Sequence, residues 1–122
     1  MMRLWLFIAG FGGAVSVAAG AVAAHLADDP ATATLLRNGS LYGMVHAAAL
    51  VAVIGFAQGR EPRRGAAVVA GWCFALGIVL FSLGQFAHAV SGLHQFALIV
   101  PVGGAAFILG WASLAILAFR RR

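Results

Sequence analysis

The sequence predicts an all-α membrane protein, a single domain of residues 1–122 that folds as a bundle of four transmembrane helices. Of the 122 residues, 63% are hydrophobic and only 9% are charged, whereas an average soluble domain has about 25% charged residues. A chain of this size exposes much of its surface even when folded. Its eight basic and three acidic residues cannot cover that surface, so the composition excludes a soluble globule.

Four uncharged runs have the length that a bilayer requires, about 17 to 25 residues each. The predicted spans are 4–26, 41–57, 65–89 and 96–119. Gly39, the Pro62 turn and the Ser91-Gly92 pair separate them. A secretory signal peptide is rejected for the first run, because that run is longer than a typical signal-peptide core.

Between the first two spans, the sequence predicts a short interfacial helix over 31–37. Asp29 is a typical N-cap residue, and Pro30 suits the first helical position because it needs no backbone donor there. Gly39 is a typical stop signal. We therefore expect this helix to lie on the membrane surface, separate from the second span.

The arginines predict that both chain termini face the cytoplasm. With four spans, Arg3, the three arginines of 60–64 and the three of 120–122 share one side of the membrane, and only Arg37 lies on the other. Basic residues beside spans collect on the cytoplasmic side. This placement also explains the net charge of +5 without nucleic acid as a partner.

Small residues on the first helix indicate where it packs. Lipid tails give helices no hydrophobic reason to associate, so small residues mark the faces where backbones approach closely. At about 100° per residue, Gly12, Ser16 and Gly20 fall on one face. We expect that face to contact other helices.

The fourth span carries a similar face, formed by Gly103 and Gly110. Pro101 lies within this span and cannot donate a hydrogen bond to the carbonyl four residues earlier. Together with the adjacent Gly103-Gly104 pair it predicts a kink. Helix packing is the simple interpretation of these residues, and a hinge or ligand notch is the alternative.

Histidines supply the candidate site. Ionisable groups within spans are functional hypotheses by default, and all four histidines fall toward the outer side of the predicted bundle. We expect His25 and His46 to approach each other and to line a small polar pocket with Tyr42. Gln85 and His88, three residues apart on the third span, face the same way.

Three interpretations of these histidines stay open. They can be structural, they can handle protons or a cofactor, or His25, His46 and His88 can bind a transition metal such as copper or zinc. The metal interpretation has no support from spacing, because the chain has no His-x-x-x-His or Cys-x-x-Cys pair. No cofactor is therefore predicted, and a transition metal is the alternative.

Catalytic motifs are absent from the sequence. Ser16, Ser82 and Ser113 lie in spans without an evident histidine and acid partner, and a serine hydroxyl in a span usually bonds to its own helix or to a neighbour. The two Gly-Gly pairs are not phosphate loops, because no lysine follows them. The sequence thus predicts a protein that is not an enzyme.

Three short motifs stand out along the chain. They are Gly-x-x-Tyr-x-x-x-His-Ala at 39–47, the segment 77–82 ending in Leu-Phe-Ser, and Pro-Val-Gly-Gly at 101–104 followed by Leu-Gly-Trp at 109–111. Together they resemble the domain-of-unknown-function 423 family, small four-helix membrane proteins that include the eukaryotic transmembrane protein 256 group. The resemblance covers nearly the whole chain. It implies a protein of the bacterial inner membrane, without an established reaction.

The resemblance also singles out a set of positions. They are His25, Tyr42, His46, Pro101, Gly103 and Gly104. The chain departs from the family after Leu-Phe-Ser, where it has Leu-Gly-Gln-Phe at 83–86 in place of Gly-Ser-Leu-Tyr. A role for that family tyrosine cannot be carried over.

Two classes of function remain. The first is a non-enzymatic accessory or oligomerising component, embedded in the lipid bilayer and associated with a second copy or with another membrane protein. The second is a small transporter or redox accessory that handles a metal, a proton or a quinone-type ligand through the outer-side histidines. Small-residue helix faces and short loops favour the first class.

Overall fold

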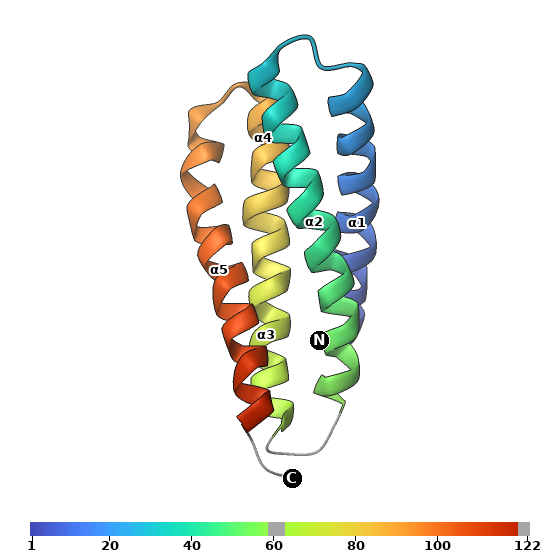
Figure 1. The fold of residues 1–122 in the computed structure, drawn as a ribbon, viewed down its shortest axis with the longest axis vertical. Coiled ribbons are helices and arrows are strands. Elements are labelled where there is room, and N and C mark those ends of the chain that lie inside the picture. The colour runs from blue at the N-terminus through green and yellow to red at the C-terminus, as the bar shows by residue number, and fades with distance from the viewer. Residues whose placement is uncertain (59–62, 120–122) are drawn as a thin grey trace.

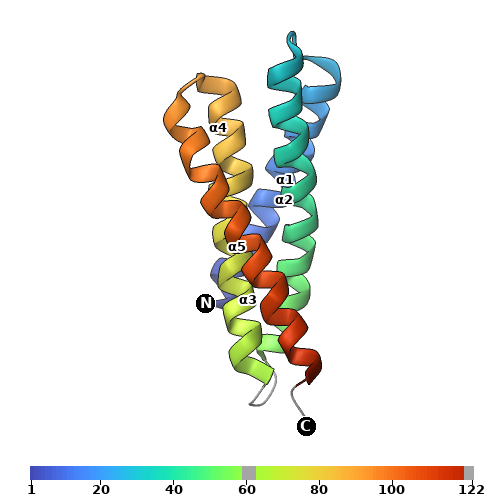
Figure 2. The ribbon, with the colours of Figure 1, turned by 60° about the vertical axis from the view of Figure 1, so that its left-hand side comes forward.

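The protein is a bundle of long helices that lie side by side (Figures 1 and 2). A computed structural model describes residues 1–58 and 63–119. The helical elements are α1 (Met2–His25), α2 (Pro30–Ala57), α3 (Arg63–Gly77), the π-helical segment η1 (Ile78–Leu83), α4 (Gly84–Ser91) and α5 (His94–Phe119). Elements α3, η1 and α4 follow one another without a break, so within the described residues four helices are long and apolar enough to cross a membrane. This confirms the predicted fold class.

Helix α2 corrects one expectation. It begins as predicted, because the Asp29 carboxylate accepts a hydrogen bond of 2.8 Å from the Thr32 amide and Pro30 occupies the first turn. The separate interfacial helix over 31–37 is wrong, since α2 continues without a stop through Gly39. The Phe86 ring occupies the space that a side chain at Gly39 would need. Packing at this position outweighs glycine's helix cost of about 1 kcal/mol.

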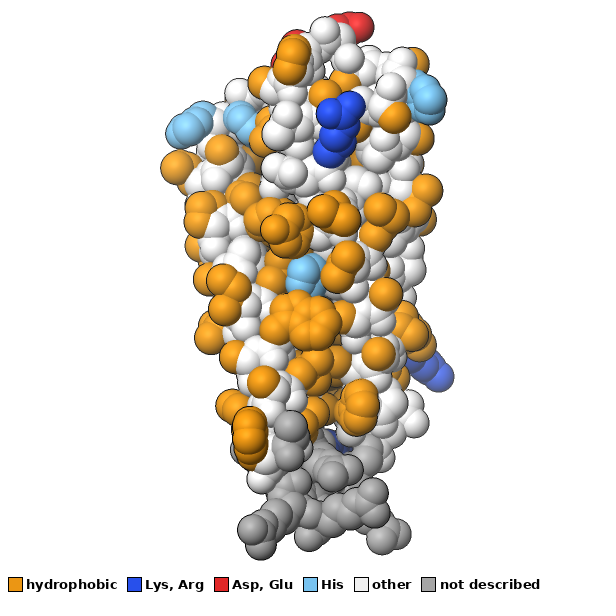
Figure 3. Space-filling model, viewed as in Figure 1, with side chains coloured by type: hydrophobic (Ala, Val, Ile, Leu, Met, Phe, Trp, Pro, Cys, Tyr) orange, Lys and Arg blue, Asp and Glu red, His pale blue; other side chains and the backbone are white. Residues whose placement is uncertain are grey.

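Both ends of the bundle are defined by the chain's connections. The start of α1, the end of α2, the start of α3 and the end of α5 lie at one end, and the α1–α2 and α4–α5 connections lie at the other (Figure 1). We call this second end the Asp28 end. Arg3 and Arg64 lie near the opposite end. Residues 60–62 of the turn predicted at 60–64 and the arginines 120–122 fall outside the described residues, and Arg63 and Arg64 begin α3. Figure 3 shows acidic side chains at the Asp28 end and hydrophobic ones along the sides.

The larger core lies in the half of the bundle away from the Asp28 end. Its fully buried large side chains include Trp5, Leu50, Phe74 and Ile78, and alanines fill the space between them. Small residues let the backbones approach closely there, which is how helices associate in lipid. A second, smaller cluster around Phe86 lies nearer the Asp28 end.

Helix α1 contacts its neighbours through small residues. The Ile78 side chain lies so close to Gly12 that a Cβ there would be 2.6 Å from it. A Cβ at Gly20 would be 2.7 Å from the Ser40 hydroxyl. Ser16 lies between these two glycines and is also buried. Between Gly12 and Gly20, the inward face of α1 therefore has no room for larger side chains.

Helix α5 approaches the α3–η1 helix in the same way. A Cβ at Gly103 would lie 2.8 Å from the Phe81 Cβ and against the Phe81 backbone. One at Gly110 would lie 2.5 Å from the Phe74 ring. Pro101 is exposed within α5, which is helical on both sides of it. The close backbone approach lies only about half a turn beyond this proline, where Gly103 meets the π-helical segment η1.

Candidate functional site

The buried histidine of the described chain is His46, which is 4% exposed. It lies about 24 Å along α2 from Pro30, at about 1.5 Å rise per residue, so it sits near the middle of the bundle. The Trp111 indole N–H donates to His46 Nε2 at 3.0 Å. The proton of the imidazole must then reside on Nδ1, which donates to the Tyr42 carbonyl at 2.7 Å. Both ring nitrogens are thus bonded within the chain, in one neutral tautomer.

Aromatic rings surround this histidine. Phe107 stacks on the imidazole with ring centroids 3.5 Å apart and an interplanar angle of 13°. Phe74 and Trp111 pack against it at steeper angles, with centroids 5.5 and 6.0 Å away. Together these contacts fix the plane of the imidazole as well as its hydrogen bonds.

Local packing explains why α5 delivers its rings to this point. The Phe107 ring lies over Gly77, where any Cβ would collide with it. One turn away, Gly103 lets α5 approach the η1 backbone. Trp111 follows Phe107 by one turn of α5, so its indole falls on the same face. Two glycines on different helices therefore set the depth of the aromatic side chains.

A cavity of about 310 Å³ opens beside the histidine, between α2, η1 and α5. Tyr42 and Trp111 are 45% and 47% exposed, so the cavity opens toward the lipid-facing side. Its lining comprises Tyr42, His46, Phe81, Gly104, Phe107, Ile108 and Trp111. His46 has no free ring nitrogen for a ligand in this arrangement.

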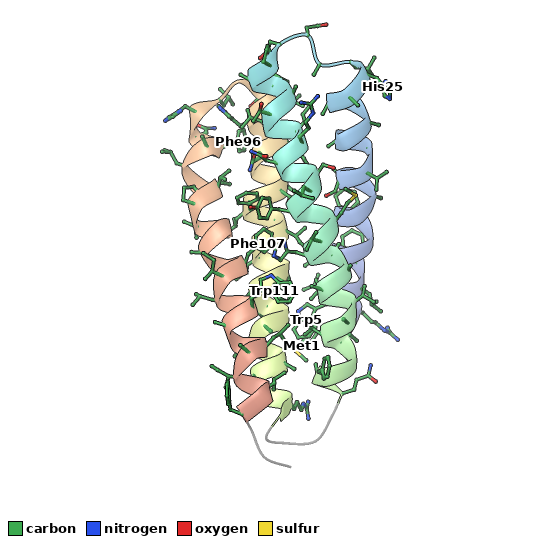
Figure 4. All side chains as sticks on the ribbon, in the orientation of Figure 1. Met1, Trp5, His25, Phe96, Phe107 and Trp111 are labelled. Carbon is green, nitrogen blue, oxygen red and sulfur yellow. The ribbon has the colours of Figure 1, made fainter. Side chains whose placement is uncertain are left out.

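The predicted pocket between His25 and His46 is not formed. His25 is exposed at the end of α1, and Figure 4 shows it near the upper end of the bundle, well above Phe107 and Trp111. The reason is the length of α2. Because this helix begins at Pro30 and not near residue 41, His46 lies several turns deeper than expected. Tyr42 does lie beside His46, with ring centroids 6.1 Å apart.

Gln85 and His88 lie together at the Asp28 end, as their spacing suggests. They border a cavity of about 170 Å³. Gln85 is 5% exposed and its side-chain oxygen has no hydrogen-bond partner in the described chain. His88 Nδ1 bonds the Leu93 carbonyl at 2.9 Å, and the His94 ring lies 6.4 Å from the His88 ring between centroids. The four histidines thus separate into one deep residue and three near the surface.

The arrangement of ligating side chains gives no support to a metal site at these histidines. Within residues 1–58 and 63–119, no group of three His, Cys, Asp or Glu side chains lies close enough together to hold a metal ion. His46 lies deep in the bundle, whereas His25 and His88 lie near the Asp28 end on two other helices. A common site of the three would require the helices to rearrange.

Two buried serines converge beside α2. Ser16 of α1 and Ser82 of η1 are fully buried, and their hydroxyls meet at Gly43, where a Cβ would touch the first and lie 3.1 Å from the second. Neither hydroxyl has a partner in the described part of the chain. By contrast, Ser113 bonds back to its own helix, at 2.8 Å from the Leu109 carbonyl. The expectation that such hydroxyls bond to a helix carbonyl therefore fits Ser113 and not the central pair.

Sequence reasoning missed the aromatic partners of His46. Phe107 and Trp111 lie one turn apart on α5, next to the small residues Gly103 and Gly110. That spacing was the available signal, since it places two large rings beside a close helix contact. No sequence pattern pairs them with His46, which is 65 residues from Trp111 along the chain.

Comparison with known proteins identifies the family. The family described as "Protein of unknown function (DUF423)" matches residues 19–104. This segment contains the C-terminal end of α1, all of α2 to α4 and the first part of α5. The chain belongs to the DUF423 family. No solved structure matches it.

Relatives of this DUF423 protein extend over its whole length. The chain is 32% identical to the UPF0382 inner membrane protein YgdD of Escherichia coli, over 97% of the chain and 91% of the relative. It is 29% identical to the UPF0382 membrane protein YwdK of Bacillus subtilis, over 98% of each. A UPF0382 membrane protein of Haemophilus influenzae is 32% identical over all of this chain. Because the described part of the chain has four helices able to cross a membrane, the DUF423 protein is a multi-pass membrane protein.

Proposed function

We propose that the protein is a non-enzymatic component of a bacterial inner membrane, a structural or accessory subunit that acts by association with itself or with another membrane protein. The observation that carries this proposal is the use of His46. Both of its ring nitrogens bond to helices of the same chain. An imidazole so engaged serves to hold helices together and has no lone pair left for a metal or a proton in transit.

The Trp111–His46 hydrogen bond matters because α5 otherwise packs against only one neighbouring helix, the continuous α3–η1–α4 helix. Helix α5 packs mainly against α3, η1 and α4. The Trp111–His46 bond and the Phe107 stack connect it to α2. Hydrogen bonds between helices are a recognised source of association in lipid. The proposal accordingly includes no catalytic residue, no cofactor and no bound metal.

The proposed orientation has both termini in the cytoplasm. Arg3 and Arg64 lie at the end of the bundle opposite the Asp28 end, and Arg37 lies toward the Asp28 end. This excess of arginine at the end that holds the termini supports a cytoplasmic position for that end, by the positive-inside rule. Fusions of a cytoplasmic fluorescent reporter and of a periplasmic phosphatase to the C-terminus test it. Fluorescence without phosphatase activity is expected, and the opposite pattern would overturn the orientation.

The proposed function is tested on the full chain extracted from bacterial membranes in native nanodiscs. Native mass spectrometry after cross-linking within the membrane gives its oligomeric state and any stoichiometric partner, and elemental and quinone analysis gives its ligand content. We expect a defined oligomer or complex that persists in the His46→Leu/Trp111→Phe double variant. Because both partners of the hydrogen bond are replaced together, no buried polar group is left unpaired.

Two results would overturn this function. One is a monomer without a stoichiometric partner. The other is a stoichiometric metal or quinone that His46→Leu abolishes while circular dichroism shows the helices intact. As a matched control, His25→Leu replaces an exposed histidine at the membrane surface and should change neither readout.

A further inference from the structure

An apolar groove of about 400 Å³ runs between α1 and α4 near the Asp28 end. Val15 and Val22 of α1 form one wall, Phe86 and Val90 of α4 form the other, and Ala19 lies between them. The volume falls within the range of about 300 to 1,000 Å³ that is typical of small-molecule sites. The groove is therefore large enough for a flexible apolar chain.

Carboxylates stand at one end of this groove. Asp28 and Asp29 line it together with Thr32, and its lining includes no arginine or histidine. Arg37 lines a separate cavity that shares the Asp28-Asp29 connection. Hydrogen bonds from Thr32, first from its side chain and then from its backbone amide, hold the pKa of Asp29 below the ordinary value. Asp29 is thus ionised at neutral pH, so the mouth of the groove is negative.

The position of the carboxylates fits the level of lipid headgroups. They lie in the connection between α1, which ends at His25, and α2, which begins at Pro30. Both helices are candidate spans, so their shared end lies at a membrane surface. A molecule in the groove would then have its apolar part between helices and its polar part beside Asp28 and Asp29.

We propose that this groove binds a phospholipid whose headgroup carries a primary ammonium, of the phosphatidylethanolamine class. One acyl chain lies between α1 and α4, and the ammonium lies beside the carboxylates of Asp28 and Asp29. The acyl chain itself gains little binding free energy in the groove, because the bilayer already surrounds it with apolar atoms. Selectivity comes from the headgroup, since an ammonium offers three donors to carboxylates. Phosphatidylglycerol carries only negative charge there and is disfavoured.

The test places the full chain in nanodiscs of equal phosphatidylethanolamine and phosphatidylglycerol content and measures, by native mass spectrometry, the lipids that stay bound after transfer to detergent. Exposed charge pairs are weak, so we expect an enrichment of about two- to fivefold for phosphatidylethanolamine. Asp28→Asn/Asp29→Asn should reduce the ratio to that of the bulk lipid. Asparagine is also a good N-cap, so the start of α2 stays intact.

Matched variants separate headgroup recognition from shape. Arg64→Gln changes an exposed charge near the opposite end and should leave the enrichment unchanged. Ala89→Leu fills the groove and should reduce retention of every lipid, whereas Ala21→Leu, exposed on α1 outside the groove, should not. Phosphatidylcholine, whose ammonium has no N–H, should be retained less well than phosphatidylethanolamine.

Three outcomes would overturn the proposal. They are equal retention of phosphatidylethanolamine and phosphatidylglycerol by the unaltered chain, an unchanged ratio in the double asparagine variant, and equal retention of phosphatidylcholine. None of them bears on the oligomeric state or on the ligand content at His46. The lipid site and the proposed function can therefore fail separately.

Discussion

Replacing Trp111 by phenylalanine tests the role assigned to His46. The change removes the indole N–H that donates to His46 Nε2 at 3.0 Å and keeps an aromatic ring on α5. Trp111 is 47% exposed and His46 only 4%, so the main loss is the hydrogen bond and not ring burial. A bond between membrane helices contributes about 0.6 and at most about 1.7 kcal/mol, and an unpaired buried acceptor costs about 1 to 3 kcal/mol. We expect the free energy of unfolding to fall by about 1 to 2 kcal/mol.

The assay is equilibrium unfolding in mixed micelles by titration with sodium dodecyl sulfate, followed by far-ultraviolet circular dichroism. A double-mutant cycle with His46→Leu isolates the pair, and we expect a coupling energy of about 0.6 to 1.7 kcal/mol. Trp72→Phe is the matched control, because Trp72 is similarly exposed at 40%. It should change stability by about 0.5 kcal/mol or less. If the stability losses of the two single variants sum to the loss of the double variant within about 0.3 kcal/mol, the two residues are not coupled and the reasoning is refuted.

Two further variants test the helix contacts and the helix cap. Gly103→Ala should destabilise the fold by about 1 to 3 kcal/mol, because its Cβ would lie against the Phe81 backbone. Gly104→Ala is the control and should be nearly neutral, because its Cβ meets only the Phe81 ring at 3.6 Å. Equal shifts of the melting temperature in detergent for the two variants would contradict this prediction. Hydrogen bonds from Thr32 lower the pKa of Asp29, so the stability that this cap supplies is present above the ordinary value of 3.8 and is lost as pH falls through the lower folded-state value. Asp29→Asn keeps the cap without a titrating group, so its melting temperature should fall less than that of the unaltered protein below pH about 4. If the melting temperatures of the variant and the unaltered protein fall in parallel, ionisation of Asp29 does not stabilise the fold.

Helix α2 shows where local signals suffice and where they do not. The N-cap at Asp29 and the proline that follows it are decided by four neighbouring residues, and the structure has both as the sequence predicts. The stop at Gly39 is different. Glycine ends a helix only when nothing offsets its cost, and here the Phe86 ring from a distant helix fills the space beside it. A local pattern cannot contain that information.

The fold class, the number of spans and the family follow from the amino-acid sequence alone, whereas the start of the second span does not. Each follows from quantities that are local or summed along the chain: the scarcity of charge, the length of the apolar runs and the motifs around Tyr42, His46 and Pro101. The tertiary structure alone decided the depth of His46 and its partners. Its hydrogen bond to Trp111 joins residues 65 positions apart. The close contacts at Gly77 and Gly103 set where α5 meets the α3–η1 helix. Such contacts depend on how side chains of different helices fit together, and that fit exists only once the helices have packed.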